Sequence, residues 1–134
     1  MDCEWIRKIR NQDNIFARQL GIVTTELSSG FARGEMVIRN EYRNLVHSVH
    51  DACVFTMADA LGGSACASYG THVTTVNGNL NYTVAMIDTG KLTGTAEVVA
   101  VTDKVMTTEI RLSDDTGRLV AIGLFEYCKL KTKY

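Results

Sequence analysis

The sequence has no proline, no excess of charge of either sign and no long apolar run. Its 134 residues include 14 basic and 15 acidic side chains, and the net charge of -1 argues against binding DNA or RNA through a broad basic face. No apolar run approaches the ~20 residues that a membrane span needs. Charged residues are spread through the N-terminal helical pattern, so we expect no signal peptide. We therefore predict a protein whose partners are neither nucleic acids nor membranes.

Patterns typical of metal sites and disulfide scaffolds are also missing. The cysteines are Cys3, Cys53, Cys66 and Cys128. No two of them have Cys-x-x-Cys spacing. His47 and His50 are three positions apart in an expected loop, which is a common coincidence, so we expect no metal site. We interpret the cysteines as reduced thiols of a cytoplasmic protein, two of them in the core.

The length predicts a single domain over residues 1–134. Apolar residues at roughly helical spacing in residues 2–20 predict a helix on the domain surface, broken near Asn11–Asn14. We therefore divide the chain into an N-terminal helical segment, residues 1–20, and a core, residues 21–134.

Several segments of the core have the composition or the period-two alternation of β-strands. They are Ile22–Leu27, Phe31–Arg39, Thr71–Tyr82, Leu92–Thr102, Val105–Ser113 and Arg118–Leu130. Turn residues join the first two segments and the last two, which favours a hairpin at each place. Residues 40–49 are polar and irregular, and we expect a loop there.

The segment Asp51–Ser68 is rich in alanine and nearly apolar on every side, which is typical of a buried helix, and Asp51 is the expected N-cap. A helix that is apolar all round needs something to surround it. We therefore predict an α+β fold in which one long antiparallel β-sheet is wrapped around this central α-helix. The edges of such a sheet favour self-association.

Asp59 lies in the middle of this apolar helix, where an aspartate is rarely buried without a partner. Most residues on its face of the helix are small, including Gly62 and Gly63, so that a ligand can approach the carboxylate closely. Two interpretations stay open at this point. Asp59 is either a reactive carboxylate or a structural one that is hydrogen-bonded to Thr56 or to a neighbouring loop.

Polar residues also precede this helix, in the expected loop that contains Asn44 and His50. A helix N-terminus presents free backbone N–H groups and the positive end of the helix dipole, which suits a developing oxyanion. Asp51, at that end, is two helical turns from Asp59, on the order of 12 Å. The two cannot act on one reacting atom within one chain, so we hypothesise that they meet across a dimer interface.

The spacing of Asn44, His50 and Asp59 resembles that of the hotdog-fold acyl-CoA thioesterases of the phenylacetate-degradation (PaaI-like) family. The signature of that family is Asn, five residues, His-Gly-Gly, six residues and Asp. The strand His72–Tyr82 and the turn Asp115–Ala121 also resemble segments of the family. The similarity covers about residues 20–128 and implies a hotdog fold.

The resemblance implies a role for each matching residue. Asp59 would be the nucleophile or general base that drives attack on the thioester carbonyl, and Thr75 would help to position water. Asn44 would hold this water or polarise the carbonyl. The backbone N–H of Asp51 would be the oxyanion donor, and His50 would orient the loop.

The resemblance also implies that Asn44 and Asp51 face Asp59 of the partner subunit in a homo-oligomer, a dimer or a tetramer built as a dimer of dimers. Coenzyme A would enter as part of an acyl- or aryl-CoA substrate, with no other cofactor. Lys104 and Lys129 are the candidates for contacting its phosphates.

The chain departs from the family signature at Asp51-Ala52, which stand where the family has two glycines. Glycine lets a thioester approach the backbone closely, and a carboxylate beside an oxyanion hole opposes the charge that the hole must stabilise. The alternative function is therefore a non-catalytic hotdog module that binds acyl-CoA or acts in assembly. A hydratase is a further alternative, and a serine hydrolase is disfavoured because no Gly-x-Ser-x-Gly elbow is present.

Overall fold

The computed structural model describes residues 2–134, which form two layers: one antiparallel β-sheet and the helices packed against it. The helices are α1 (Cys3–Asp13), α2 (Ile15–Gln19) and α3 (Asp51–Ala67), with a short 3₁₀ turn, η1 (Asn40–Tyr42). The strands are β1 (Ile22–Ser28), β2 (Phe31–Val37), β3 (Thr71–Tyr82), β4 (Lys91–Val101), β5 (Val105–Ser113) and β6 (Leu119–Lys133). Their order in the sheet is β1-β2-β4-β5-β6-β3, so β1 and β3 form its two edges.

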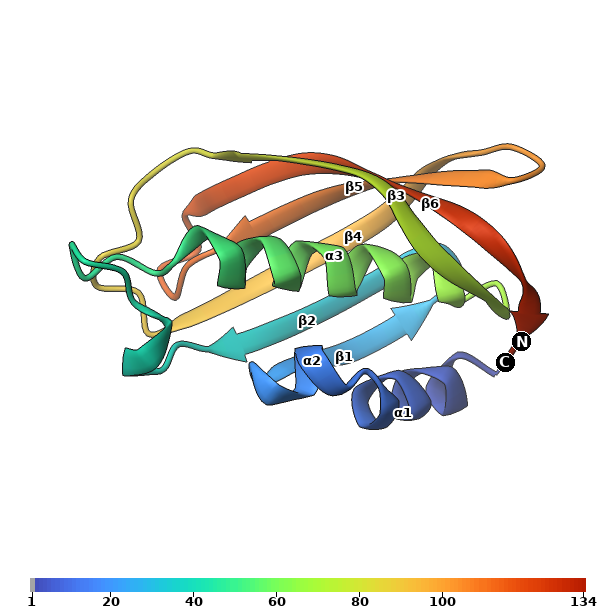
Figure 1. Ribbon diagram of the computed structural model, residues 1–134, viewed down its shortest axis with the longest axis horizontal. Helices are drawn as coiled ribbons and strands as arrows, with labels where there is room; N and C mark the ends of the chain where they lie inside the picture. Colours follow the sequence, from blue (N-terminus) through green and yellow to red (C-terminus); the bar gives the residue numbers. More distant parts are fainter. Residues whose placement is uncertain (1) are drawn as a thin grey trace.

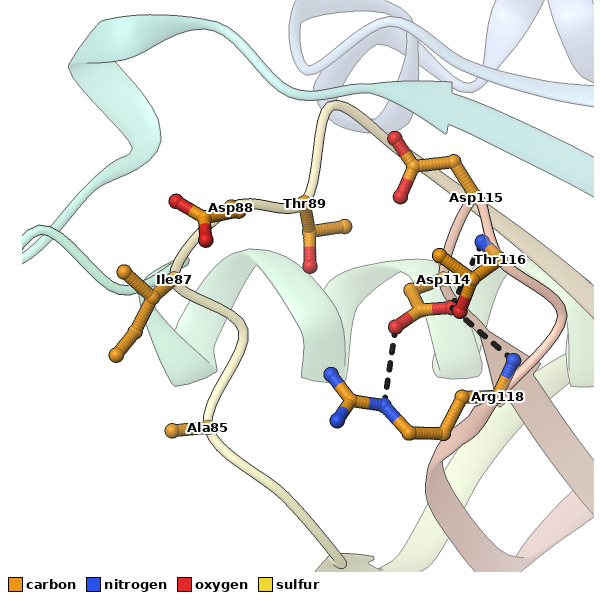
Figure 2. Close-up of a pocket in the computed structure, with 8 residues that line it drawn as sticks. All are labelled: Ala85, Ile87, Asp88, Thr89, Asp114, Asp115, Thr116 and Arg118. Atoms are coloured by element: carbon orange, nitrogen blue, oxygen red, sulfur yellow. Dashed lines mark hydrogen bonds and ion pairs between the residues drawn. The ribbon is translucent and has the colours of Figure 1, made fainter.

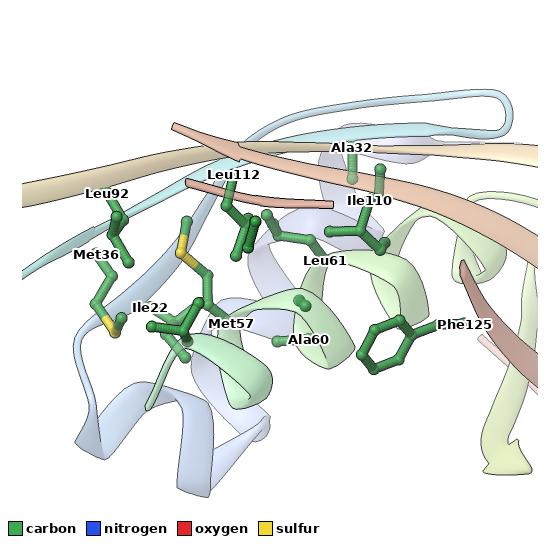
Figure 3. Close-up of a cluster of buried hydrophobic side chains, with 14 of the residues drawn as sticks. Ile22, Ala32, Met36, Met57, Ala60, Leu61, Leu92, Ile110, Leu112 and Phe125 are labelled. Carbon is green, nitrogen blue, oxygen red and sulfur yellow. The ribbon is translucent and has the colours of Figure 1, made fainter. Parts of the chain in front are cut away.

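Helix α3 lies along the sheet, which curls around it (Figure 1). Val54, Met57 and Leu61 of this helix are completely buried, as expected of a helix without a polar face. The sheet side chains that cover them come from alternate positions of neighbouring strands, and Figure 3 shows Met36, Leu92, Ile110 and Leu112 between the strands and α3. The predicted hotdog arrangement of a wrapped sheet and a central helix is confirmed.

Glycines on two neighbouring strands let α3 approach the sheet closely. Gly34 of β2 is paired directly with Gly94 of β4. A Cβ atom at either position would overlap the side chain of Leu61, which fills the space between the two strands. Leu61 therefore fixes α3 at one position along the sheet.

The N-terminal helices lie beside β1, on the edge of the sheet away from β3 (Figure 1). The break predicted near Asn11–Asn14 is confirmed, because α1 ends at Asp13 and α2 begins at Ile15. Ile6 is fully buried. Asn11 both donates to and accepts from the backbone of Thr24, at 2.9 and 2.8 Å.

Two sequence predictions are wrong. The N-cap of α3 is His50 and not Asp51, because the imidazole Nδ1 of His50 accepts the N–H of Ala52 at 3.0 Å and Asp51 is the first helical residue. Two cysteines were expected in the core, but only Cys66 is buried. Cys53, near the N-terminal end of α3, is only partly buried and packs against the edge of the core cluster.

Within residues 2–134, no helix has both the length and the apolar character that crossing a membrane requires.

The neighbouring glycines Gly62 and Gly63 of α3 provide a test of how closely helix and sheet are packed. A Cβ atom at Gly62 would overlap the hydroxyl of Tyr127, a residue that is 1% exposed and whose hydroxyl is held by its hydrogen bond to Asp59. At Gly63 it would lie 3.0 Å from the end of the Arg10 side chain, which can shift. Both replacements by alanine gain the same helix propensity of about 1 kcal/mol. We expect Gly62→Ala to be less stable than Gly63→Ala by about 1–3 kcal/mol.

Urea unfolding of the two variants measures this difference, and each serves as the control for the other. Equal free energies of unfolding would contradict the close packing of Gly62 against Tyr127.

Candidate active site

Asp59 of α3 is partly exposed, and its carboxylate accepts a hydrogen bond from the hydroxyl of Thr75 on β3 at 2.6 Å between Oγ1 and Oδ1. The structure thus brings together two residues that the sequence placed in one site. Thr56 is not the partner of Asp59, since its hydroxyl donates to the carbonyl oxygen of Ala52 instead. One carboxylate oxygen of Asp59 is held by Thr75, and the other has no hydrogen-bond partner within residues 2–134.

An irregularity in the sheet accompanies this contact. The pairing of β3 with β6 shifts between Thr75 and Asn77, where β3 contains an extra residue, Val76. Bulges of this kind bend a strand and change the direction of its side chains, and they are frequent beside active sites. The shift in register begins immediately after the residue that contacts Asp59.

Asp59 opens into a cavity of about 240 Å³ whose wall comes from five parts of the chain. Its lining residues include Arg10 of α1, Asn14 between α1 and α2, Thr74 of β3 and Tyr127 of β6. The sequence analysis did not identify these four. Tyr127 lies on the inward-facing alternation of β6, which could have indicated its direction, whereas nothing in the sequence pattern connects Arg10 or Asn14 with Asp59.

Tyr127 fixes the backbone of α3 at Asp59. Its hydroxyl donates a hydrogen bond to the carbonyl oxygen of Asp59 at 2.9 Å. Burial, and after it the charge of Asp59, raises the pKa of Tyr127 well above the ordinary value, so this hydroxyl stays protonated and remains a donor at neutral pH.

The N-terminus of α3 has one unused backbone donor. The N–H of Ala52 is capped by His50, whereas the N–H of Asp51 has no acceptor within residues 2–134. Neither Asp51 nor Ala52 has a positive φ, so the backbone here does not require the glycines that the family signature has. The side chain of Asp51 is exposed. The backbone carbonyl oxygen of Asp51 accepts a hydrogen bond from the hydroxyl of Tyr82 at 2.9 Å.

Asn44 organises the loop that precedes α3. Its side-chain oxygen accepts the backbone N–H groups of Val46 and Ser48 at 3.0 and 3.1 Å. His47, in the same loop, has a φ of 62°, in the left-handed region that favours glycine. The side-chain nitrogen of Asn44 has no partner within residues 2–134 and is free to donate to a ligand.

The predicted site residues are thus divided between two places. Asn44 and His50 line an open hollow of about 670 Å³ at the N-terminal end of α3. Asp59 and Thr75 line the cavity in the middle of the helix. The structure brings together the members of each pair and does not bring the two pairs together in one chain.

The two candidate phosphate-binding lysines lie near the turn between β4 and β5. The ammonium of Lys129 donates a hydrogen bond to the carbonyl oxygen of Thr102 at 3.0 Å. The backbone N–H of Lys129 donates to the carbonyl oxygen of Lys104 at 2.8 Å. They are neighbours, but neither lines the cavity beside Asp59 or the hollow beside Asn44.

A further cavity, of about 450 Å³, lies where the loop of residues 83–90 meets the turn between β5 and β6 (Figure 2). The polar side chains in its wall already form hydrogen bonds that stabilise the turn between β5 and β6. Asp114 accepts hydrogen bonds from the hydroxyl and N–H of Thr116 and from Arg118, and Asp115 accepts the N–H of Gly90. We assign this cavity a structural role.

Comparisons with known proteins agree with this fold. The family model described as the thioesterase superfamily matches residues 47–121. An Archaeoglobus fulgidus protein named "Putative esterase" is 26% identical over 98 residues, and the match covers 73% of this chain but only 64% of that protein.

Two solved structures show the same fold. The Escherichia coli PaaI protein from the phenylacetic acid degradation operon superposes with a TM-score of 0.92 at 20% identity, over 98% of this chain and 95% of that one. A hypothetical thioesterase from Streptococcus pneumoniae, solved with coenzyme A, superposes with a TM-score of 0.83 at 21% identity, over 95% of this chain and 98% of that one.

The turn at Asp114 gives a prediction for the dependence of stability on pH. The hydrogen bond from the Thr116 hydroxyl is the largest cause that lowers the pKa of Asp114 below the ordinary value of 3.8. A carboxyl group whose pKa is lower in the folded state stabilises the fold above its ordinary pKa, and this contribution is lost as the pH falls through the folded value. We expect Asp114→Asn to lower the Tm at neutral pH and the difference from wild type to shrink below about pH 4.

Thermal unfolding followed between neutral and acidic pH measures this difference. In a Thr116→Val background, which lacks the largest cause of the shift, the dependence on pH should be weaker. A Tm difference that is the same at pH 3 and pH 7 would rule out this role of Asp114.

Proposed function

The chain belongs to the thioesterase superfamily, and we propose that it hydrolyses acyl- or aryl-coenzyme A thioesters with Asp59 as the reactive carboxylate. The observation that carries the proposal is the hydrogen bond from Thr75 to Asp59 at the wall of a cavity large enough for an acyl group. The coenzyme A in the similar structure from S. pneumoniae supports a coenzyme A ester as the substrate.

In this mechanism the hydroxyl of Thr75 holds one oxygen of the Asp59 carboxylate and leaves the other free to act. As a general base, that oxygen takes a proton from water while the water oxygen bonds to the thioester carbonyl carbon. The C–S bond then breaks, and the coenzyme A thiolate leaves and is protonated. The same geometry also suits direct attack by the carboxylate: its oxygen bonds to the carbonyl carbon, the C–S bond breaks, the coenzyme A thiolate leaves and is protonated, and water then hydrolyses the anhydride to the free acid and the Asp59 carboxylate.

The negative oxygen that develops on the carbonyl needs donors, and α3 offers one at its N-terminus. The backbone N–H of Asp51 is unused there and lies at the positive end of the helix dipole. The free side-chain nitrogen of Asn44 is a second donor. His50 keeps this end of the helix in place by capping it.

These donors lie at the N-terminal end of α3 and Asp59 lies in its middle, so we propose that the complete site forms between two copies of the chain. Strand β3 is an edge of the sheet, and its outer backbone groups are unpaired within residues 2–134. A long exposed edge favours pairing with another strand. Apolar side chains lie exposed beside both halves of the site, with Leu45 99% and Val76 54% exposed. A homodimer joined along β3, or a tetramer of two such dimers, would cover them.

Lys104 and Lys129 are proposed to contact the phosphates of coenzyme A from the turn between β4 and β5. The reaction needs no metal or separate cofactor. The free thiols fit a reducing compartment, which favours the cytoplasm.

The alternative is a hotdog module that binds acyl-CoA without hydrolysing it, and the observation that favours it is the carboxylate of Asp51 beside the oxyanion donor. Two observations favour catalysis instead. The side chain of Asp51 is exposed, and its backbone N–H is unused. Tight binding of an acyl-CoA without release of thiol would support the alternative.

Replacement of Asp59 by asparagine tests the proposed reaction. The amide has nearly the same shape but is neither a base nor a nucleophile, so we expect hydrolysis to fall by at least about 100-fold. Release of thiol from short, long and aromatic acyl-CoA esters is the measurement. Asp88→Asn, on an exposed loop, is the matched control and should keep its activity. Unchanged turnover by Asp59→Asn would refute the assignment.

Complementation between two inactive variants tests the shared site. Asp59→Asn and Asn44→Ala damage different halves, so a mixed dimer keeps one intact site. Random mixing of equal amounts should restore about a quarter of the wild-type activity. If the mixture, after dissociation and reassembly, stays as inactive as each variant alone, the site is not shared between copies.

A further inference from the structure

Arg10, a residue of the N-terminal helix α1, lies in the wall of the cavity beside Asp59 and is bound there by three hydrogen bonds. Its Nε donates to the hydroxyl of Ser64 at 2.7 Å, one Nη to the hydroxyl of Tyr134 at 3.1 Å and the other Nη to the carbonyl oxygen of Ala60 at 3.2 Å. A guanidinium has five N–H groups. Three are used in these bonds, so two remain available to a ligand.

Glycine at position 63 makes room for this arrangement. A Cβ atom there would lie 3.0 Å from a terminal nitrogen of Arg10, so the guanidinium rests directly against α3. Asp59 is one helical turn away on the same face. Arg10 nevertheless forms no ion pair with Asp59 within residues 2–134, although both side chains line the same cavity. The charge of Arg10 is therefore not neutralised by an ion pair with Asp59, and it stays available to a ligand.

The rest of the cavity wall is also mostly polar. Asn14 and Thr74 line it, and the side chain of Asn14 has no hydrogen-bond partner within residues 2–134. Val73 and Ala60 supply its few apolar atoms. An aliphatic chain in this space would separate the Arg10 cation and the unpaired Asn14 amide from water without replacing their hydrogen bonds, and that is costly.

The cavity suits the acyl part of the substrate. Its volume is about 240 Å³, whereas coenzyme A is a nucleotide with a long pantetheine arm and is much larger. When the thioester carbonyl lies at Asp59, the group that extends into the cavity is therefore the acyl group, and the coenzyme A lies outside.

We propose that this cavity selects a short acyl group that carries a neutral oxygen substituent, such as a hydroxyl, and that Arg10 determines this specificity by donating to that oxygen. The inference rests on the proposed function, which supplies the thioester. A carboxylate substituent suits the cavity less, because it would bring a second negative charge into the same space as Asp59.

The test compares kcat/KM for matched esters that differ only in one hydroxyl: hydroxybutyryl-CoA with butyryl-CoA, and terminally hydroxylated hexanoyl-CoA with hexanoyl-CoA. We expect wild type to favour at least one hydroxylated ester by about tenfold, as a hydrogen bond to a charged group suggests. In Arg10→Met, which has a similar shape and no donors, that ratio should fall to about one. Arg7→Met is the matched control and should keep the preference, since Arg7 bonds Glu4 and the backbone of Thr24 away from the cavity.

Arg10 also holds α1 against α3, so each variant is first checked by thermal unfolding. If Arg10→Met does not fold, Arg10→Lys replaces it. The lysine keeps the charge but lacks the planar fork of N–H groups that can bind α3 and a ligand at the same time. The Arg10→Lys variant should therefore lose most of the preference for the hydroxylated esters. Equal kcat/KM for both members of each pair in wild type, or a preference that survives in the folded Arg10 variant, would overturn the inference. A higher kcat/KM for succinyl-CoA than for the hydroxylated esters would also overturn it.

Failure of the proposed function gives a different result. If wild type hydrolyses no ester, calorimetry with the same four esters still measures the preference as a ratio of Kd values. Tighter binding of a hydroxylated ester by wild type and not by the Arg10 variant would support the inference while refuting hydrolysis. Equal binding would overturn both.

Discussion

The fit of Leu61 between Gly34 and Gly94 is the contact on which the position of α3 depends. A helix without a polar face can slide or rotate on an apolar sheet at little cost, since hydrophobic contact is not directional. A slot that only one side chain fills removes that freedom. Since Asp59 lies on the same helix, two residues before Leu61, its place opposite Thr75 follows from this packing.

Tyr127 and Arg10 add polar contacts that also hold α3 in its position on the sheet. Both donate to backbone carbonyl oxygens of α3 at or next to Asp59, namely those of Asp59 and Ala60. Each approaches through the space left by a glycine, Gly62 for the tyrosine and Gly63 for the arginine. The pair of glycines in the middle of α3 therefore weakens the intrinsic propensity of the helix and in return admits two side chains that hold it.

Much of the architecture could be predicted from the sequence because the hydrophobic periods are clear. The apolar helix, the alternating strands and the break at Asn14 all appear where the pattern indicates, and Asp59 stood out as a carboxylate among apolar residues. The contribution of Arg10 could not be predicted, since it depends on how α1 folds back onto α3 across fifty residues. The cap by His50 was missed because a ring nitrogen took the place that short polar side chains usually occupy.

The attachment of α1 has a consequence for motion. Besides the buried Ile6, this helix is held by hydrogen bonds from Arg7, Arg10 and Asn11. Segments with few buried apolar contacts open at a lower free energy than the core, so the docking of α1 is a local equilibrium. Because Arg10 forms part of the cavity wall, any molecule that binds this wall also shifts α1 toward the docked state. Slower hydrogen exchange in the amides of α1 would then report that the cavity is occupied, without the need for a chemical reaction.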